Sequence, residues 1–336
     1  MPERDRNIMM NPAPACILDN PNLRFSLVNS VDFSSDGRYL VVTFTSNNVV
    51  GLYSIDQKLN PVLVTRLRNP LLGQVVKSAK LLNEPSFAAF SPDSKILAVS
   101  NYGSATINIY KRSSDKSGYG VKPCSIFHTP NELKAIQPHT MAFSRDGKHL
   151  AVTYFDYSRT CSDVLVIYSV DTDRAAITDE QALTVHLPGS PKGVAYTPDG
   201  THLAITLCDT NSVSLYDLEK GCMTQILKNP AAGLSLPENI AFTPDGSLSA
   251  VVNSADHSIA FYRFDKAGNV FTDARPCFVL KNPEAGLRFP HGIAFSPDGK
   301  VLAITQFGPV KIAKNGDIEC NRWTMPREDK VLFYGL

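Results

Sequence analysis

The stretch "IAFSPDGKVLAIT" at residues 293–305 decides the fold, because the chain repeats its pattern six times. Each copy has an apolar strand that ends in an anchor aromatic, a Ser/Thr-x-Asp turn that usually contains glycine, and a second apolar strand. The other copies are "VDFSSDGRYLVVT" (31–43), "AAFSPDSKILAVS" (88–100), "MAFSRDGKHLAVT" (141–153), "VAYTPDGTHLAIT" (194–206) and "IAFTPDGSLSAVV" (240–252). The anchor aromatics are Phe33, Phe90, Phe143, Tyr196, Phe242 and Phe295.

A third strand that ends in tyrosine follows each copy, as in "VVGLY" and "VSLY", and a fourth strand and a crossover lead to the next copy. These tyrosines are Tyr53, Tyr110, Tyr168, Tyr216, Tyr262 and Tyr334. Four short strands per repeat, at a period of about fifty residues, are typical of a β-propeller. We therefore predict an all-β, six-bladed β-propeller with four-stranded antiparallel blades.

The two ends of the chain are predicted to share one blade. The last copy stops at "KVLFYGL", its third strand, whereas the opening "ACILDNPNLRFSLVNSVDF" matches a fourth strand and crossover. The N-terminal strand around residues 16–18 should complete the last blade and leave no free sheet edge there. We expect an N-terminal tail over 1–14 and one propeller domain over 15–336, with a blade-six insert at about 307–330.

The repeated polar residues have a structural interpretation. One aspartate occupies the same turn in every copy, where its carboxylate can accept hydrogen bonds from backbone N–H groups. The six are Asp36, Asp93, Asp146, Asp199, Asp245 and Asp298. A catalytic group would not be needed six times, so we assign these aspartates to turns and the repeated aromatics to the core.

The repeat resembles the "SPDG" and YVTN-type propeller repeats over almost the whole chain. The forms "PHTMAFSRDG" and "PHGIAFSPDG" are most similar to lactonase-like propellers, and the six-bladed count is similar to gluconolactonase-like proteins. The resemblance implies the propeller fold. It also implies a lactone-type hydrolase or isomerase as one possible activity, since propellers carry many functions.

The residue four before each anchor aromatic differs in every blade except for a repeated histidine. These residues are Asn29, Ser86, His139, Lys192, Glu238 and His291, and in five copies a proline precedes them. They should ring the channel mouth, with His139 across from His291 and Glu238 between His291 and Lys192. Such a ring could bind an anion or a metal, or supply a general base. The alternative is a solvated rim with a Lys192–Glu238 ion pair.

Further candidates lie at other positions where the copies differ. Eleven residues after the anchor, the amides Asn101, Asn253 and Gln306 could add oxygen ligands to a cation site of the kind that the gluconolactonase-like resemblance implies. Asp32 replaces an alanine that the other five copies share. We expect it either to face channel water or, the favoured alternative, to bond to a neighbouring blade.

The blade-six insert is the fourth place where the copies differ. Asn315-Gly316, flanked by alternating residues, predicts a small β-hairpin. The insert also carries Arg322 and Trp323, the only tryptophan of the chain. Because tryptophan and arginine are enriched in binding hot spots, this hairpin is a candidate partner-binding surface. The alternative is a loop that packs on its own rim.

The composition limits the classes of binding partner that we expect. With 33 basic and 32 acidic residues the net charge is +1, so no overall field favours nucleic acid or an anionic membrane. The seven cysteines form no C-x-x-C pair, which favours reduced thiols. No apolar run is long enough to span a membrane, and the charged N-terminus lacks the apolar core of a secretory signal. We expect a cytoplasmic monomer whose partner is a protein or a small polar ligand, and neither nucleic acid nor a membrane.

Two function hypotheses follow. The first is a non-catalytic binding or scaffold propeller that recognises a protein partner or small polar ligand on its elaborated face. The second is a lactonase-like or gluconolactonase-like hydrolase with His291 or His139 as base and Glu238 as a further site residue. No cofactor is expected, although the second hypothesis leaves room for a divalent cation.

Overall fold

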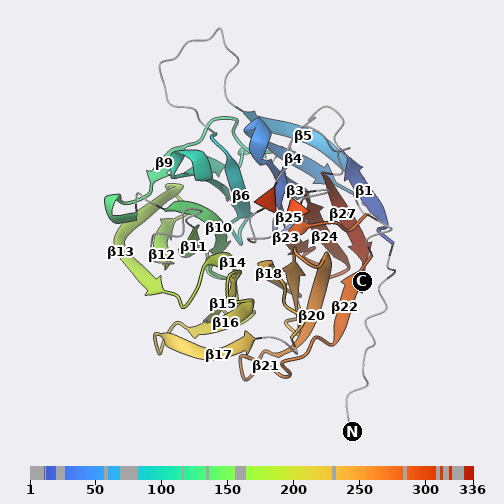
Figure 1. Ribbon diagram of the computed structural model, residues 1–336. Helices are drawn as coiled ribbons and strands as arrows, with labels where there is room; N and C mark the ends of the chain where they lie inside the picture. Colours follow the sequence, from blue (N-terminus) through green and yellow to red (C-terminus); the bar gives the residue numbers. More distant parts are fainter. Residues whose placement is uncertain are drawn as a thin grey trace.

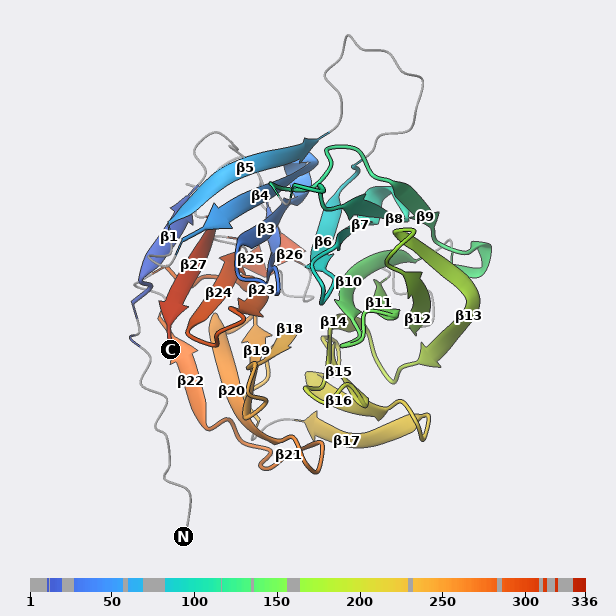
Figure 2. The same ribbon diagram turned by 180° about the vertical axis from the view of Figure 1, so that it is seen from behind.

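A computed structural model describes most of the chain. The described residues are 11, 13–19, 27–56, 60–68, 82–115, 117–133, 136–155, 164–228, 232–282, 286–307, 311–312, 318–319 and 329–336. Six antiparallel sheets stand radially around a common centre (Figures 1 and 2). The predicted six-bladed propeller is confirmed.

The first three blades follow the repeat from the centre outward, each with four consecutive strands. Blade one contains β2 (Val28–Phe33), β3 (Tyr39–Phe44), β4 (Val49–Ile55) and β5 (Pro61–Arg68). Blade two contains β6 (Pro85–Phe90), β7 (Ile96–Asn101), β8 (Thr106–Lys111) and β9 (Ser125–His128). Blade three contains β10 (Gln137–Phe143), β11 (His149–Phe155), β12 (Val164–Asp171) and β13 (Ala176–His186).

The last three blades have the same plan with two variations. Blade four contains β14 (Pro191–Tyr196), β15 (His202–Leu207), β16 (Ser212–Asp217) and β17 (Cys222–Lys228). Blade five contains β18 (Pro237–Phe242), β19 (Leu248–Asn253), β20 (Ser258–Asp265), the short β21 (Val270–Phe271) and β22 (Phe278–Lys281). Blade six contains β23 (Pro290–Phe295), β24 (Val301–Gln306), β27 (Lys330–Gly335) and β1 (Cys16–Asp19).

The N-terminal strand closes the ring, as predicted. β1 pairs with β27 in the register Cys16 to Phe333 and Leu18 to Val331. Cys16 and Leu18 pack against the cluster of buried residues shared by blades six and one. The two ends of the chain therefore complete one sheet.

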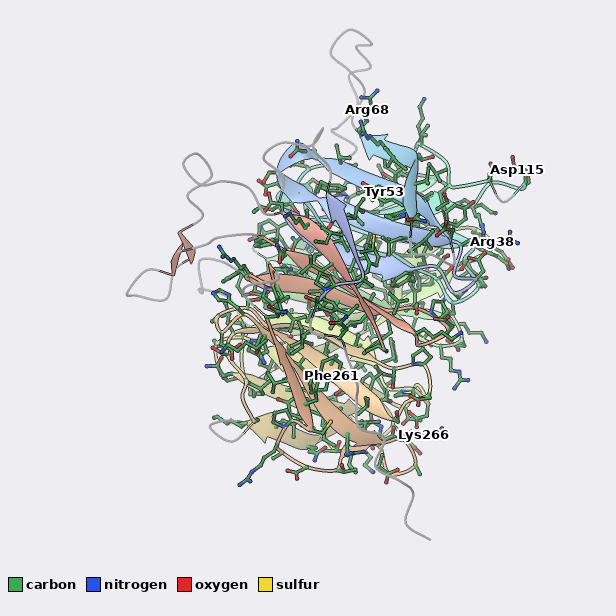
Figure 3. The ribbon with its side chains drawn as sticks, turned by 90° about the vertical axis from the view of Figure 1, so that its right-hand side faces the viewer. Arg38, Tyr53, Arg68, Asp115, Phe261 and Lys266 are labelled. Carbon is green, nitrogen blue, oxygen red and sulfur yellow. The ribbon has the colours of Figure 1, made fainter. Side chains whose placement is uncertain are left out.

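The predicted blade-six hairpin is also present. β25 (Lys311–Ile312) pairs antiparallel with β26 (Ile318–Glu319). Figure 3 shows this hairpin on the side of the ring opposite to Arg38 and Lys266.

The repeated residues have the predicted structural roles. In each turn the aspartate accepts a hydrogen bond from a Ser or Thr hydroxyl and one from a backbone N–H, as Asp298 does from Ser296 at 2.6 Å and from the Lys300 N–H at 3.1 Å. All six third-strand tyrosines are buried. The part of the chain that the structure describes contains three short 3-10 helices, at Thr45–Asn47, Tyr102–Ser104 and Asn131–Leu133. In the described residues no helix is long and apolar enough to cross a membrane.

The cysteines of the described residues are reduced thiols, as predicted. The cysteines of the described residues, Cys16, Cys124, Cys208, Cys222 and Cys277, are all free. The chain is therefore held together by strand pairing and apolar packing between blades rather than by disulfides among these residues.

Candidate functional site

The predicted ring of variable residues lies at the start of the innermost strands, and all its members are buried. Their exposed fractions lie between 2% and 8%; the six are Asn29, Ser86, His139, Lys192, Glu238 and His291. The expectation of a solvated rim is therefore wrong. The Lys192–Glu238 ion pair is present, but it is enclosed, because bulky neighbours cover it.

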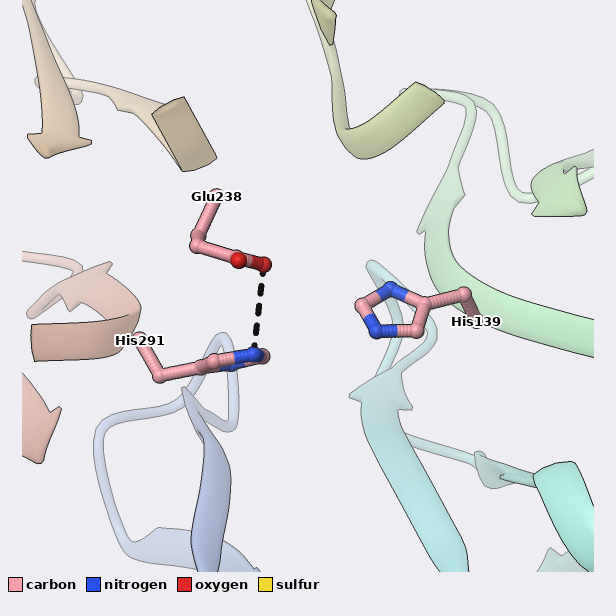
Figure 4. Close-up of side chains that lie close together, drawn as sticks. All are labelled: His139, Glu238 and His291. Carbon is pink, nitrogen blue, oxygen red and sulfur yellow. Dashed lines mark ion pairs between the residues drawn. The ribbon is translucent and has the colours of Figure 1, made fainter. Parts of the chain in front are cut away.

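Four of these residues converge on one point, and we call His139, Lys192, Glu238 and His291 the polar cluster. Oε2 of Glu238 lies 3.2 Å from Nε2 of His291 and 3.7 Å from Nζ of Lys192. The two imidazole centroids are 5.9 Å apart, and Figure 4 shows His139 facing Glu238 and His291. The predicted order around the ring is correct.

Each histidine of the polar cluster is held by the backbone of the next blade. Nδ1 of His139 lies 3.2 Å from the carbonyl oxygen of Lys192, and Nδ1 of His291 lies 3.1 Å from that of Asn29. A carbonyl oxygen only accepts hydrogen bonds, so Nδ1 carries the hydrogen in both rings. Nε2 is the atom left to act in the cluster.

Close contact between blades six and one fixes His291. Its neighbour Gly292 leaves no room for a side chain, because a Cβ would lie 2.8 Å from both the carbonyl oxygen of Asn29 and Oγ1 of Thr305. Thr305 donates a hydrogen bond of 3.0 Å to that same carbonyl oxygen. The acceptor that orients His291 is thus itself held in place.

Two phenylalanines that sequence reasoning missed cover the polar cluster. The Lys192 ammonium lies 3.9 Å from the ring centroid of Phe155, and Phe307 stacks on His291 with centroids 4.4 Å apart. Both lie twelve residues after an anchor aromatic, and only the two histidine blades have phenylalanine there. That coincidence is the signal that could have found them.

The groups of the polar cluster shift one another's pKa values. Burial alone would raise the pKa of Glu238, but the charge of Lys192 and the contact with His291 outweigh it and lower the pKa to about 2. Burial, reinforced by Lys192 and His291, lowers the pKa of His139 well below its usual value. At neutral pH the cluster therefore combines an ionised carboxylate with a neutral imidazole at His139.

The predicted amide ligands hold loops. Oδ1 of Asn101, Oδ1 of Asn253 and Oε1 of Gln306 each accept a hydrogen bond from the backbone N–H eighteen residues earlier, at 3.1 to 3.3 Å. All three side chains are fully buried. Each amide ties its second strand to the crossover that enters its blade, and ligand binding by these residues stays a prediction.

Two predicted binding residues, Arg322 and Trp323, lie outside the described residues. The β25–β26 pairing confirms the hairpin, but its partner-binding role stays a prediction.

A separate cavity of about 540 Å³ lies along the channel, lined by all six blades. The anchor aromatics Phe143, Tyr196, Phe242 and Phe295 line it and are only partly buried, whereas Phe33 and Phe90 are buried. These four partly buried anchors still pack against the buried clusters of their blades, so the assignment of the anchors to the core is confirmed, with four of the rings only partly covered.

Asp32 borders this cavity and joins blades one and two. Its Oδ2 accepts a hydrogen bond of 2.9 Å from the N–H of Phe90, and its Oδ1 accepts one of 2.9 Å from the N–H of Phe33. The favoured prediction of a bond to a neighbouring blade is confirmed. Burial outweighs these two hydrogen bonds and raises the pKa of Asp32 to about 7.

This raised pKa predicts a pH-dependent stability. The unfolded pKa is about 3.9, so the folded state holds the extra proton between about pH 4 and 7, and stability falls as pH rises through that window. The shift sets an upper limit of ~4 kcal/mol, which cavity water should reduce to ~1–3 kcal/mol. Urea unfolding at pH 5 and pH 8 should show this loss for the wild type relative to Asp32→Asn; parallel pH profiles would contradict the assignment.

Comparison with known proteins gives one family match. The model of the lactonase family, described as seven-bladed β-propellers, matches residues 68–306, more than two thirds of the chain. This chain has six blades in its described part. No curated protein sequence matches it significantly.

Solved structures share the fold at low sequence identity. A proposed 6-phosphogluconolactonase from Bacteroides uniformis is 15% identical with a TM-score of 0.61, over 90% of this chain and 87% of the other. A periplasmic gluconolactonase from Pseudomonas aeruginosa is 16% identical with a TM-score of 0.59, over 90% and 85%. A chain of a mitotic checkpoint complex is 12% identical with a TM-score of 0.55, over 100% and 95%. The family match favours the hydrolase hypothesis over the scaffold hypothesis.

Proposed function

Because this chain belongs to the lactonase family of β-propellers, we propose that its polar cluster hydrolyses a lactone to the corresponding hydroxy acid. The observation that carries the proposal is that Glu238, Lys192 and the two histidines lie close together and are buried. Oε2 of Glu238 is 3.2 Å from Nε2 of His291. Buried ionisable groups of opposite sign and shifted pKa are characteristic of catalytic sites.

The chemistry assigns a role to each side of the cluster. Lactone hydrolysis adds water to the acyl carbon, passes through a tetrahedral oxyanion, and breaks the acyl carbon–oxygen bond of the ring. The imidazole and carboxylate groups would accept the proton of the attacking water and return it to the departing ring oxygen. The ammonium of Lys192 would stabilise the oxyanion, where low polarity strengthens its effect.

The cluster also bears on the substrate class. A lactone presents a polar ester group and, in sugar lactones, several hydroxyls, which suit a site with charged donors and acceptors. Phe155 and Phe307 would limit water around it, since they cover Lys192 and His291. We therefore favour a small polar lactone over a long apolar ester.

A panel of γ- and δ-lactones of sugar acids, with and without a phosphate group, tests the proposal by acid release. We expect hydrolysis of at least one, and a loss in kcat/KM of at least about a hundredfold in His139→Asn, which keeps a donor near the Nδ1 position but removes Nε2. His202→Asn is the matched control, because His202 also faces a carboxylate, that of Asp217 at 3.4 Å, but lies outside the cluster.

The panel has a clear contrary outcome. If no lactone is opened faster than in buffer, or if His139→Asn and His202→Asn are equally active, the hydrolase proposal fails. The scaffold hypothesis, with partner capture by the blade-six insert, would then be favoured, and removal of residues 308–329 would test it.

A further inference from the structure

Three ligand-forming side chains of the polar cluster converge in a way that the hydrolase proposal does not require. His139, Glu238 and His291 each offer one donor atom, and these atoms all lie within 4.8 Å of one another. Among the described residues, this is the one such group of three or more His, Cys, Asp or Glu side chains. All three residues are buried, so the group differs from an ordinary acidic surface.

The spacing suits a tetrahedral ion. Bonds of ~2.0–2.1 Å to nitrogen and oxygen place neighbouring ligand atoms about 3.3 Å apart. The atoms Nε2 of His291 and Oε2 of Glu238 are 3.2 Å apart. Two of three donors therefore stand at metal-ligand spacing, and His139 faces them from the opposite side (Figure 4).

The imidazole rings are oriented as metal ligands usually are. A ligating histidine commonly donates its other ring N–H to a carbonyl or carboxylate, which fixes the tautomer and directs the free nitrogen at the metal. Both His139 and His291 make this bond through Nδ1 to a backbone carbonyl of the next blade. Nε2 of each ring is left to bind.

The carboxylate of Glu238 has ion-pair contacts with Lys192 and His291. Oε2 of Glu238 is buried and accepts no aligned hydrogen bond, despite the close Nε2 of His291. A cation held by both atoms would satisfy them together.

We propose that His139, Glu238 and His291 bind one divalent transition-metal ion, zinc being the first candidate. Two imidazole nitrogens and one carboxylate oxygen suit zinc and similar ions better than calcium, which prefers oxygen ligands. This set differs from the amide-oxygen site expected around Asn101, Asn253 and Gln306, whose oxygens hold loops. A three-ligand site leaves a position open for water or substrate.

The charge of Lys192 predicts the direction in which a substitution there should change metal affinity. Its ammonium lies 3.7 Å from Oε2 of Glu238 and opposes a second cation by Coulomb repulsion. Removal of this charge should tighten metal binding. A purely structural ion pair between Lys192 and Glu238 predicts no such gain.

Titration of chelator-treated protein with Co²⁺, followed by visible absorption and by Zn²⁺ competition, tests the site. We expect one equivalent to bind, with affinity at least about tenfold weaker in His139→Asn and His291→Asn. Lys192→Met should bind about tenfold more tightly. His202→Asn should match the wild type. Binding by the exposed Cys124, Cys222 or Cys277 would give a thiolate charge-transfer band, which separates it from the predicted site.

The result that would overturn the inference is the absence of a saturable visible band, or equal affinity in the two asparagine variants and the wild type. Because these variants keep a donor near Nδ1, they should fold even if Glu238→Gln does not. The inference rests on the proposed function only for what the ion does. Metal binding without lactone hydrolysis would reject the proposed function alone, and hydrolysis by protein that binds no metal would reject the inference alone.

Discussion

Glu238→Gln should reduce kcat/KM for the lactone by about 10²- to 10⁴-fold, the range for loss of a proton-transfer group. Glu238 is the one carboxylate of the polar cluster, and it contacts both Lys192 and His291. The change also removes the negative charge that faces the buried Lys192 ammonium, which costs about 3–5 kcal/mol. Steady-state kinetics and thermal unfolding on the same preparation check both effects.

A second variant separates catalysis from stability. The double variant Lys192→Met with Glu238→Gln removes both charges, so much of the stability should return while turnover stays low. If the double variant recovers both, Glu238 acts only by holding the fold. Activity of Glu238→Gln within threefold of the wild type, at any stability, would also remove it from the mechanism.

Removal of residues 1–19 should open the ring. β1 would be lost, so the edge of β27 would present unpaired N–H and C=O groups, and the partly buried Cys16 and Leu18 would no longer cover Val331 and Phe333. We expect the melting temperature to fall by at least about 4 °C and the protein to self-associate through the open edge. Calorimetry and light scattering measure the two effects.

A shorter deletion is the matched control. Removal of residues 1–12 leaves β1 and the hydrogen bond from the Ala15 N–H to the Phe333 carbonyl, so it should behave as the full chain does. If the chain without residues 1–19 has the melting temperature of the full chain and stays monodisperse, β1 does not contribute to the stability of the closed ring.

The repeat made the backbone predictable. Each of the six strand-turn-strand copies forms one blade, so residues at the same position of the copies lie at the same level around the channel. The order of His139, Lys192, Glu238 and His291 around the centre could therefore be derived from the sequence. The same logic recognised the turn aspartates and the shared last blade, because each depends on strand pairing that the repeat dictates.

What the repeat could not predict depends on contacts between neighbouring blades and strands. The cover over Lys192 comes partly from Phe155, the last residue of β11, and the cover over His291 from Phe307, which follows β24. The orientation of each histidine depends on a carbonyl of the next blade, and backbone acceptors leave no mark in a sequence. The partial exposure of Phe143 and Tyr196 is not set by side-chain type, since Phe90 lines the same cavity and is buried.

The central claim is that the polar cluster directs water onto the acyl carbon of a lactone, and turnover in H₂¹⁸O tests it most directly. Mass spectrometry of the hydroxy acid from a single turnover should find one ¹⁸O in the carboxylate and none in the alcohol, at a rate that falls in His139→Asn. Enzyme-dependent conversion without label, as an isomerase would give, or label in the alcohol oxygen, would contradict the account.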